Sequence, residues 1–112
     1  MPNPMMCTTT MPNMESAKKM AHELVENRFA ACVQLMPINS VYRWKGEIKD
    51  ESEVLLICKA PTYHHESLQK AILERHPYEL PEILFFKGVG AYPPYLEWLE
   101  NCIINKEAYA KP

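Results

Sequence analysis

The residues on either side of Lys45-Gly46 constrain the fold more than any other part of the chain. From residue 31 to residue 44 the side chains alternate in character, which is typical of a strand, although Pro37 is expected to bend this strand and interrupt its ladder. Residues 47–59 form an antiparallel return that becomes strongly apolar towards its end. The pair Lys45-Gly46 suits a tight turn between them. Residues 31–59 therefore predict one long β-hairpin.

This hairpin is expected to be longer than the domain that carries it. Fourteen residues, 31–44, would reach roughly 46 Å at about 3.3 Å each, whereas a compact domain of this size is roughly 35 Å across. An overhanging ribbon is only marginally stable in water, so its tip at 42–46 is expected to pack on a partner, most simply another copy. Such head-to-tail contacts close into rings, of which a trimer is the smallest above a dimer. The alternative is that Pro37 splits the strand and the tip folds back on its own domain.

The remaining segments complete a pattern of strand, helix, strand, strand, helix, strand and a closing helix. The predicted elements are a short strand at 5–9, a helix capped by Asn13, a helix capped by Thr62 that stops before Pro77, a strand at 82–86, and a helix that starts at Pro93-Pro94. This order predicts a ferredoxin-like α+β fold, with helices on one face of an antiparallel sheet. We expect a single domain over residues 1–112, with 105–112 as a loose C-terminal tail.

The charge and the apolar pattern exclude several classes of partner. The net charge is -2 and the basic residues are scattered, so neither nucleic acid nor an anionic membrane is an expected partner. No apolar run reaches the roughly 20 residues of a transmembrane helix, and the start lacks the features of a signal peptide. The four cysteines are far apart, which argues against a disulfide framework. A cytoplasmic location is the expectation.

Several short motifs resemble one known family. They are Ala30-Ala31-Cys32-Val33, Tyr42-Arg43-Trp44-Lys45-Gly46, Lys59, His76-Pro77-Tyr78-Glu79 with Pro81-Glu82, and Tyr95-Leu96-Glu97-Trp98. In order and spacing, from about Cys7 to Ile104, they closely resemble the CutA divalent-cation tolerance family. The resemblance implies a ferredoxin-like homotrimer with a bent hairpin at the subunit contacts. It also implies a role in tolerance to copper and other divalent metals, with copper bound by some members.

The resemblance also suggests ligands for a metal ion. Cys7, Cys32 and His76 are the candidates for copper or another divalent ion, because thiolate and imidazole suit these metals, and Met5 and Met6 would add soft thioethers for Cu(I). The alternative for each is structural: small cysteines pack in strands, and a histidine at a helix end can bond the last carbonyl groups.

A second group of candidates combines charges with aromatic side chains that a cleft between subunits could use. These inter-subunit ligand candidates are Tyr42, Trp44, Glu53, Lys59, Glu79 and Glu82. Ordinary surface ion pairs would explain the charges equally well. No motif identifies a nucleophile with its base, so an enzyme is not expected.

Three functions follow as hypotheses. The first is a non-enzymatic homotrimer that binds metal ions and contributes to divalent-metal tolerance. The second is a signalling trimer resembling the PII type, with a small anionic ligand in the inter-subunit cleft. The third is a structural scaffold for other proteins.

Overall fold

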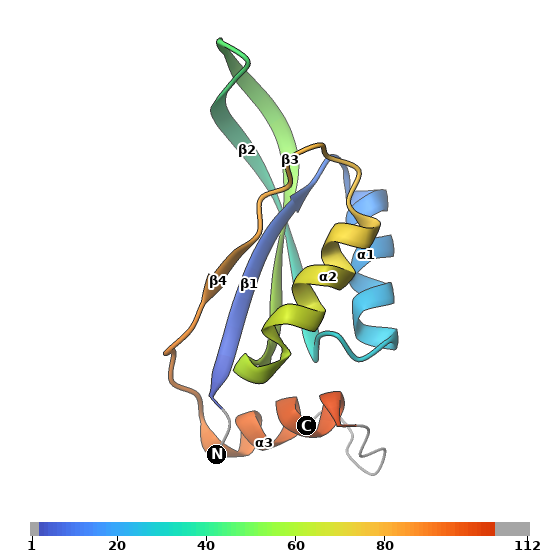
Figure 1. Ribbon diagram of the computed structural model, residues 1–112, viewed down its shortest axis with the longest axis vertical. Helices are drawn as coiled ribbons and strands as arrows, with labels where there is room; N and C mark the ends of the chain where they lie inside the picture. Colours follow the sequence, from blue (N-terminus) through green and yellow to red (C-terminus); the bar gives the residue numbers. More distant parts are fainter. Residues whose placement is uncertain (1–2, 105–112) are drawn as a thin grey trace.

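A computed structural model describes residues 3–104 of the chain (Figure 1). The predicted tail, residues 105–112, lies outside the described residues. The elements in chain order are β1 (Pro4–Met11), α1 (Met14–Glu26), β2 (Cys32–Trp44), β3 (Glu47–Pro61), a single 3-10 turn (Thr62–His64), α2 (His65–Arg75), β4 (Leu84–Phe86) and α3 (Pro93–Ile103).

The four strands form one antiparallel sheet in the order β2-β3-β1-β4. Helices α1 and α2 lie together on one face of this sheet, and α3 lies at its foot (Figure 1). The predicted α+β architecture, with helices on one face of an antiparallel sheet, is confirmed. The opposite face of the sheet is not covered by α1 or α2, and we call it the open face. None of the described helices is long and apolar enough to cross a membrane.

The core lies between the sheet and these two helices. In α1, four of the five apolar residues at helical spacing are buried, Ala17, Met20, Ala21 and Leu24, whereas Val25 is 41% exposed. The fully buried side chains that meet them come from both the sheet and α2: Met5, Cys7, Leu56, Cys58, Leu68 and Ile72. Asn13 caps α1 as predicted, because its Oδ1 accepts a hydrogen bond from the Ser16 backbone N–H at 2.8 Å.

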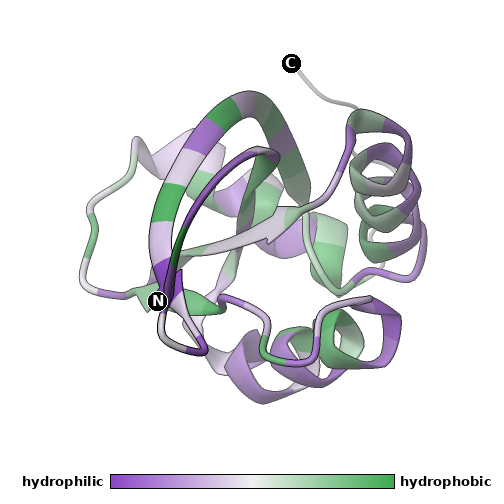
Figure 2. Cartoon of the chain, turned by 90° about the horizontal axis from the view of Figure 1, so that it is seen from above, coloured by the Kyte–Doolittle hydropathy of each residue, from purple (hydrophilic) through white to green (hydrophobic). Residues whose placement is uncertain are grey.

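The hairpin is one continuous ribbon. Its register runs from Trp44↔Glu47 at the tip to Cys32↔Lys59 at the base. Lys45 (φ 49) and Gly46 (φ 81) both have positive φ, which is the geometry of a type I′ turn. Seen from above, the ribbon arches and carries hydrophobic and hydrophilic residues in turn (Figure 2).

The expectation that Pro37 interrupts the ladder is wrong. Pro37 pairs with Val54 in the middle of the ribbon, and β2 continues to Trp44. Because β2 is an edge strand, alternate backbone N–H groups point away from β3, and a proline at such a position removes no ladder hydrogen bond.

Other boundaries also differ from the prediction, and β1 runs over Pro4–Met11 instead of 5–9. Thr62 begins the 3-10 turn rather than capping α2, and its hydroxyl donates to the Asn3 carbonyl at 3.1 Å. A side chain that is engaged with the start of the chain cannot also satisfy the first N–H groups of α2. Strand β4 has only three residues, because its pairing with β1 extends only from Met6↔Phe86 to Thr8↔Leu84.

Candidate functional site

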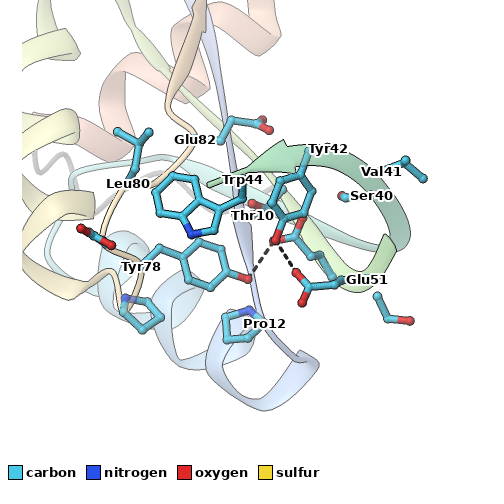
Figure 3. Close-up of a pocket in the computed structure, with 14 residues that line it drawn as sticks. Thr10, Pro12, Ser40, Val41, Tyr42, Trp44, Glu51, Tyr78, Leu80 and Glu82 are labelled. Atoms are coloured by element: carbon cyan, nitrogen blue, oxygen red, sulfur yellow. Dashed lines mark hydrogen bonds between the residues drawn. The ribbon is translucent and has the colours of Figure 1, made fainter. Parts of the chain in front are cut away.

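A pocket of about 850 Å³ lies between the distal part of the ribbon and the segment 77–82 that leads into β4. Its lining combines aromatic rings with carboxylates (Figure 3). The lining residues are Thr10, Pro12, Ser40, Val41, Tyr42, Trp44, Glu51, Ser52, Glu53, Pro77, Tyr78, Glu79, Leu80 and Glu82. This volume falls within the range of roughly 300–1,000 Å³ that is usual for small-molecule sites.

The ribbon supplies the first wall through the alternation of its strands. Tyr42 and Trp44 are two residues apart on β2, and Glu51 and Glu53 are two apart on β3, so each pair points to one side of the ribbon. The Tyr42 hydroxyl donates a hydrogen bond to Glu51 Oε1. This bond raises the pKa of Tyr42 above its usual value, so the phenol stays a neutral donor.

The segment after α2 supplies the second wall, and His76 fixes its start. The Nε2 atom of His76 lies 2.8 Å from the Thr10 carbonyl oxygen, which can only accept, so Nε2 carries the proton. The Nδ1 atom of the same ring accepts from the Tyr78 backbone N–H at 3.2 Å. Both ring nitrogens are therefore occupied within the chain, and the ring orients the residues that follow it.

Tyr78 joins the two walls. Its hydroxyl donates to Glu53 Oε2 at 2.8 Å, so a residue of the 77–82 segment holds a carboxylate of the ribbon. Burial, and then this hydrogen bond, raise the pKa of Tyr78 well above its usual value. The phenol is thus a fixed donor at neutral pH, and Glu53 is held with its second oxygen free of this bond.

The lining is acidic. Four carboxylates belong to it: Glu51, Glu53, Glu79 and Glu82. Glu82 accepts from the Thr8 hydroxyl at 3.2 Å, and Glu79 faces the Lys45 ammonium at 3.9 Å. Both members of the Lys45–Glu79 pair are largely exposed, so water screens their attraction. The pocket therefore attracts positive charge.

The structure brings together five of the six predicted cleft residues. Tyr42, Trp44, Glu53, Glu79 and Glu82 all line the pocket. Lys59 does not, because it pairs with Cys32 at the base of the ribbon, where its ammonium lies 5.8 Å from the centroid of the Tyr95 ring.

The predicted metal ligands lie in three different settings. Cys7 is fully buried on β1 opposite Cys58, and burial, with a smaller effect of Glu82, raises the pKa of its thiol to about 12. Cys32 is half-buried at the start of β2, and His76 uses both ring nitrogens in the bonds described above. Among residues 3–104 no three His, Cys, Asp or Glu side chains form a group that could hold a metal ion. This ligand set stays a prediction.

Two important lining residues were not among the sequence candidates. Glu51 and Tyr78 hold the two walls in place, and both could have been found. The two-residue turn sets the register of the ribbon, which places Glu51 on the same side as Glu53. Tyr78 belongs to a motif that the sequence already singled out, but its bond to Glu53 depends on how the 77–82 segment folds.

Known proteins match almost the whole chain. The model of the family described as CutA1 divalent ion tolerance protein matches residues 5–102. The divalent-cation tolerance protein CutA of Thermus thermophilus is 40% identical over 93 residues, a match that covers 82% of this chain and 90% of that protein. Protein CutA of Mus musculus is 42% identical over 93 residues, which cover 82% of this chain and 52% of that one. The chain thus spans about half the length of the mouse relative and of the chloroplastic relative from Arabidopsis thaliana.

Solved structures agree with this match. The crystal structure of divalent ion tolerance protein CutA1 from Ehrlichia chaffeensis superposes with a TM-score of 0.87 at 30% identity, covering 92% of this chain and 97% of that one. For the divalent cation tolerance protein from Thermus thermophilus the TM-score is 0.83 at 36% identity, covering 88% and 96%.

Proposed function

Because the chain belongs to the CutA1 divalent ion tolerance family, we propose that it is a non-enzymatic homotrimer that contributes to divalent-ion tolerance by binding divalent cations, copper among them. The observation that carries the proposal is the acidic lining of one pocket, although its four carboxylates do not form a preassembled metal site among residues 3–104. Their combined negative charge concentrates cations at the site, and carboxylate oxygens are good ligands for divalent ions.

The open face of the sheet supports self-association. Met36, Leu84 and Phe86 are 51%, 53% and 45% exposed there. Val41 and Ile48 are also exposed, but strand alternation places them on the other side of the ribbon from Met36. An apolar strip of this kind on an antiparallel sheet favours burial against another protein surface. A second copy of the chain supplies the same strip, so each copy can bury the face of another.

Of the three ligands predicted for copper, Cys32 needs the least local rearrangement. It is half-buried, whereas Cys7 is fully buried as a protonated thiol, and His76 has no ring nitrogen free. A metal could use Cys7 or His76 only after the chain opens locally. Cys32 is therefore the thiol that we assign to copper first.

The pocket gives less support to a signalling trimer with a small anionic ligand. Within residues 3–104 the lining includes no lysine or arginine, and Lys59 lies elsewhere. An anion in this pocket would meet four carboxylates of its own sign. The scaffold hypothesis makes no use of the pocket at all.

Metal titration of the reduced protein tests the proposal. Calorimetry with Zn²⁺, which does not oxidise thiols, is expected to show binding that weakens about tenfold, or ~1.4 kcal/mol, in the double variant Glu51→Gln/Glu53→Gln. Glutamine keeps an oxygen that accepts from Tyr42 and Tyr78, so the change removes charge and leaves the walls in place. Glu74→Gln on α2, an exposed carboxylate outside the pocket, is the matched control.

The same titration separates the two ligand sets. If Zn²⁺ binding is lost in Cys32→Ser and unchanged in the double glutamine variant, the metal uses thiols and the pocket has another role. If neither variant differs from the wild type, direct metal binding at these residues is refuted.

A further inference from the structure

The pocket is much larger than a metal ion, and its walls are chemically mixed. Tyr42, Trp44 and Tyr78 place three aromatic rings in the same lining as the four carboxylates, and the cavity measures about 850 Å³. Figure 3 shows these rings gathered at the centre of the pocket, with Glu51 to one side and Glu82 above. Aromatic faces attract cations and also contact methylene groups. This combination suits a cation that carries a carbon skeleton.

The chain's own ammonium group already uses part of this surface. Lys45 Nζ lies 5.6 Å from the centroid of the Trp44 ring and 3.9 Å from Glu79 Oε2. A primary ammonium between an aromatic face and a carboxylate is the contact that an external amine would make. Because Lys45 is exposed and tethered only at the turn, a ligand can displace it.

The two carboxylates on the ribbon are held in place. Glu51 is bound by the Tyr42 hydroxyl and Glu53 by the Tyr78 hydroxyl, so neither must be ordered when a ligand arrives. The two phenols are donors only to these carboxylates in the described structure, and their rings form the adjacent wall. A positive group beside Glu51 and Glu53 would therefore have its hydrocarbon part against aromatic surface.

We propose that this pocket binds a small organic ammonium compound, of which an alkyl diamine is the simplest form. One ammonium group binds beside Glu51 and Glu53, the methylene chain lies against the aromatic wall, and the second ammonium replaces Lys45 at Trp44. This inference adds a ligand class to the pocket that carries the proposed function, and it does not depend on that function being correct.

Calorimetric titration with 1,5-diaminopentane tests the inference on the full chain in its solution oligomeric state. Pentane-1,5-diol and glutarate, which are uncharged and negatively charged molecules of similar length, are the ligand controls. Binding is expected for the diamine alone. Equal binding of the diol would overturn the proposed role of charge, and absence of diamine binding would overturn the inference.

Variants with opposite expected effects make the test specific. Glu53→Gln should weaken diamine binding about tenfold, and Trp44→Leu about two- to fivefold. Lys45→Gln should tighten it about two- to fivefold, because the internal competitor is removed. Glu74→Gln should bind as the wild type does. If Glu53→Gln fails to fold by circular dichroism, Glu51→Gln replaces it, and unchanged affinity in a folded variant of either kind contradicts the proposal.

A parallel Zn²⁺ titration distinguishes the two proposals for the pocket. Zn²⁺ binding without diamine binding would leave the proposed function standing and refute the organic ligand. Diamine binding without Zn²⁺ binding would support the organic ligand and refute the binding of a divalent cation in this pocket. Competition between the two, with each ligand weakening the other, would support a shared site.

Discussion

At the scale of single residues, His76 links the pocket wall to the sheet, and its protonation should affect stability. Burial lowers its pKa below the ordinary value of 6.5, although the Thr10 carbonyl and Glu53 oppose this effect. Protonation would also place an N–H on Nδ1, where the Tyr78 backbone N–H already points. The unfolded chain therefore takes up this proton at a higher pH than the folded chain does.

The sign of the pH dependence follows directly. The contribution of His76 is fully present above pH 6.5 and is lost as pH falls through its lowered folded pKa. Burial lowers the pKa of His64 too, so both act in the same direction. We expect His76→Gln to reduce the loss of unfolding free energy between about pH 7.5 and pH 5.5, measured by urea unfolding at fixed protein concentration. His22→Gln, which changes an exposed histidine on α1, is the control. An undiminished loss in His76→Gln would contradict the assignment.

Five of the six predicted cleft residues line the pocket, and Lys59 shows why the sixth does not. Trp44 and Glu53 were chosen as candidates because one is aromatic and the other acidic, and this choice did not use their location in the fold. Lys59 lies six residues beyond Glu53 on the same strand, or roughly 20 Å along it. The two-residue turn fixes the register of the ribbon, so the distance of Lys59 from Glu53 along the strand could have been predicted from the sequence. The hydrogen bond from Tyr78 to Glu53 was not predictable, because it joins segments that only the tertiary fold brings together.

At the scale of elements, the ribbon depends on its turn. Gly46 has φ +81 and no neighbouring atom within 4 Å of an added Cβ, so Gly46→Ala would meet backbone strain without a steric clash. We expect this change to reduce the unfolding free energy by about 1–2 kcal/mol, measured by urea unfolding. Gly90 also has open space around it but lacks a positive φ, so Gly90→Ala should leave stability nearly unchanged. Equal effects of the two substitutions would show that the turn conformation is not what constrains Gly46.

The elements also show where local sequence rules fail. Helix α1 was predictable because its cap and its apolar spacing agree. Pro37 was misjudged because the cost of a proline in a strand depends on whether its nitrogen faces a partner. That orientation is set by the place of β2 at the sheet edge, which is a property of the assembled sheet and not of the segment. Thr62 was misjudged for a similar reason, since Asn3 is remote in sequence.

At the scale of the whole molecule, the overhang of the ribbon was predictable from length alone. The described structure extends 49 × 27 × 23 Å, and its radius of gyration is 14.8 Å, compared with about 13 Å for a compact chain of this length. The long axis is close to the span expected for β2. What length could not supply is the apolar open face, because it depends on which side of each strand the helices cover.

That face makes the oligomeric state the decisive property of the molecule. Leu84 and Phe86 are half-exposed on β4, where a charge would be hydrated in a single chain but buried in an assembly. Light scattering of the wild type should give three times the monomer mass of 13.0 kDa, and Leu84→Glu/Phe86→Glu should lower the mass towards one copy. Leu73→Glu, at a residue 50% exposed on the helical side, should keep the wild-type mass. A folded wild-type monomer would refute the trimer.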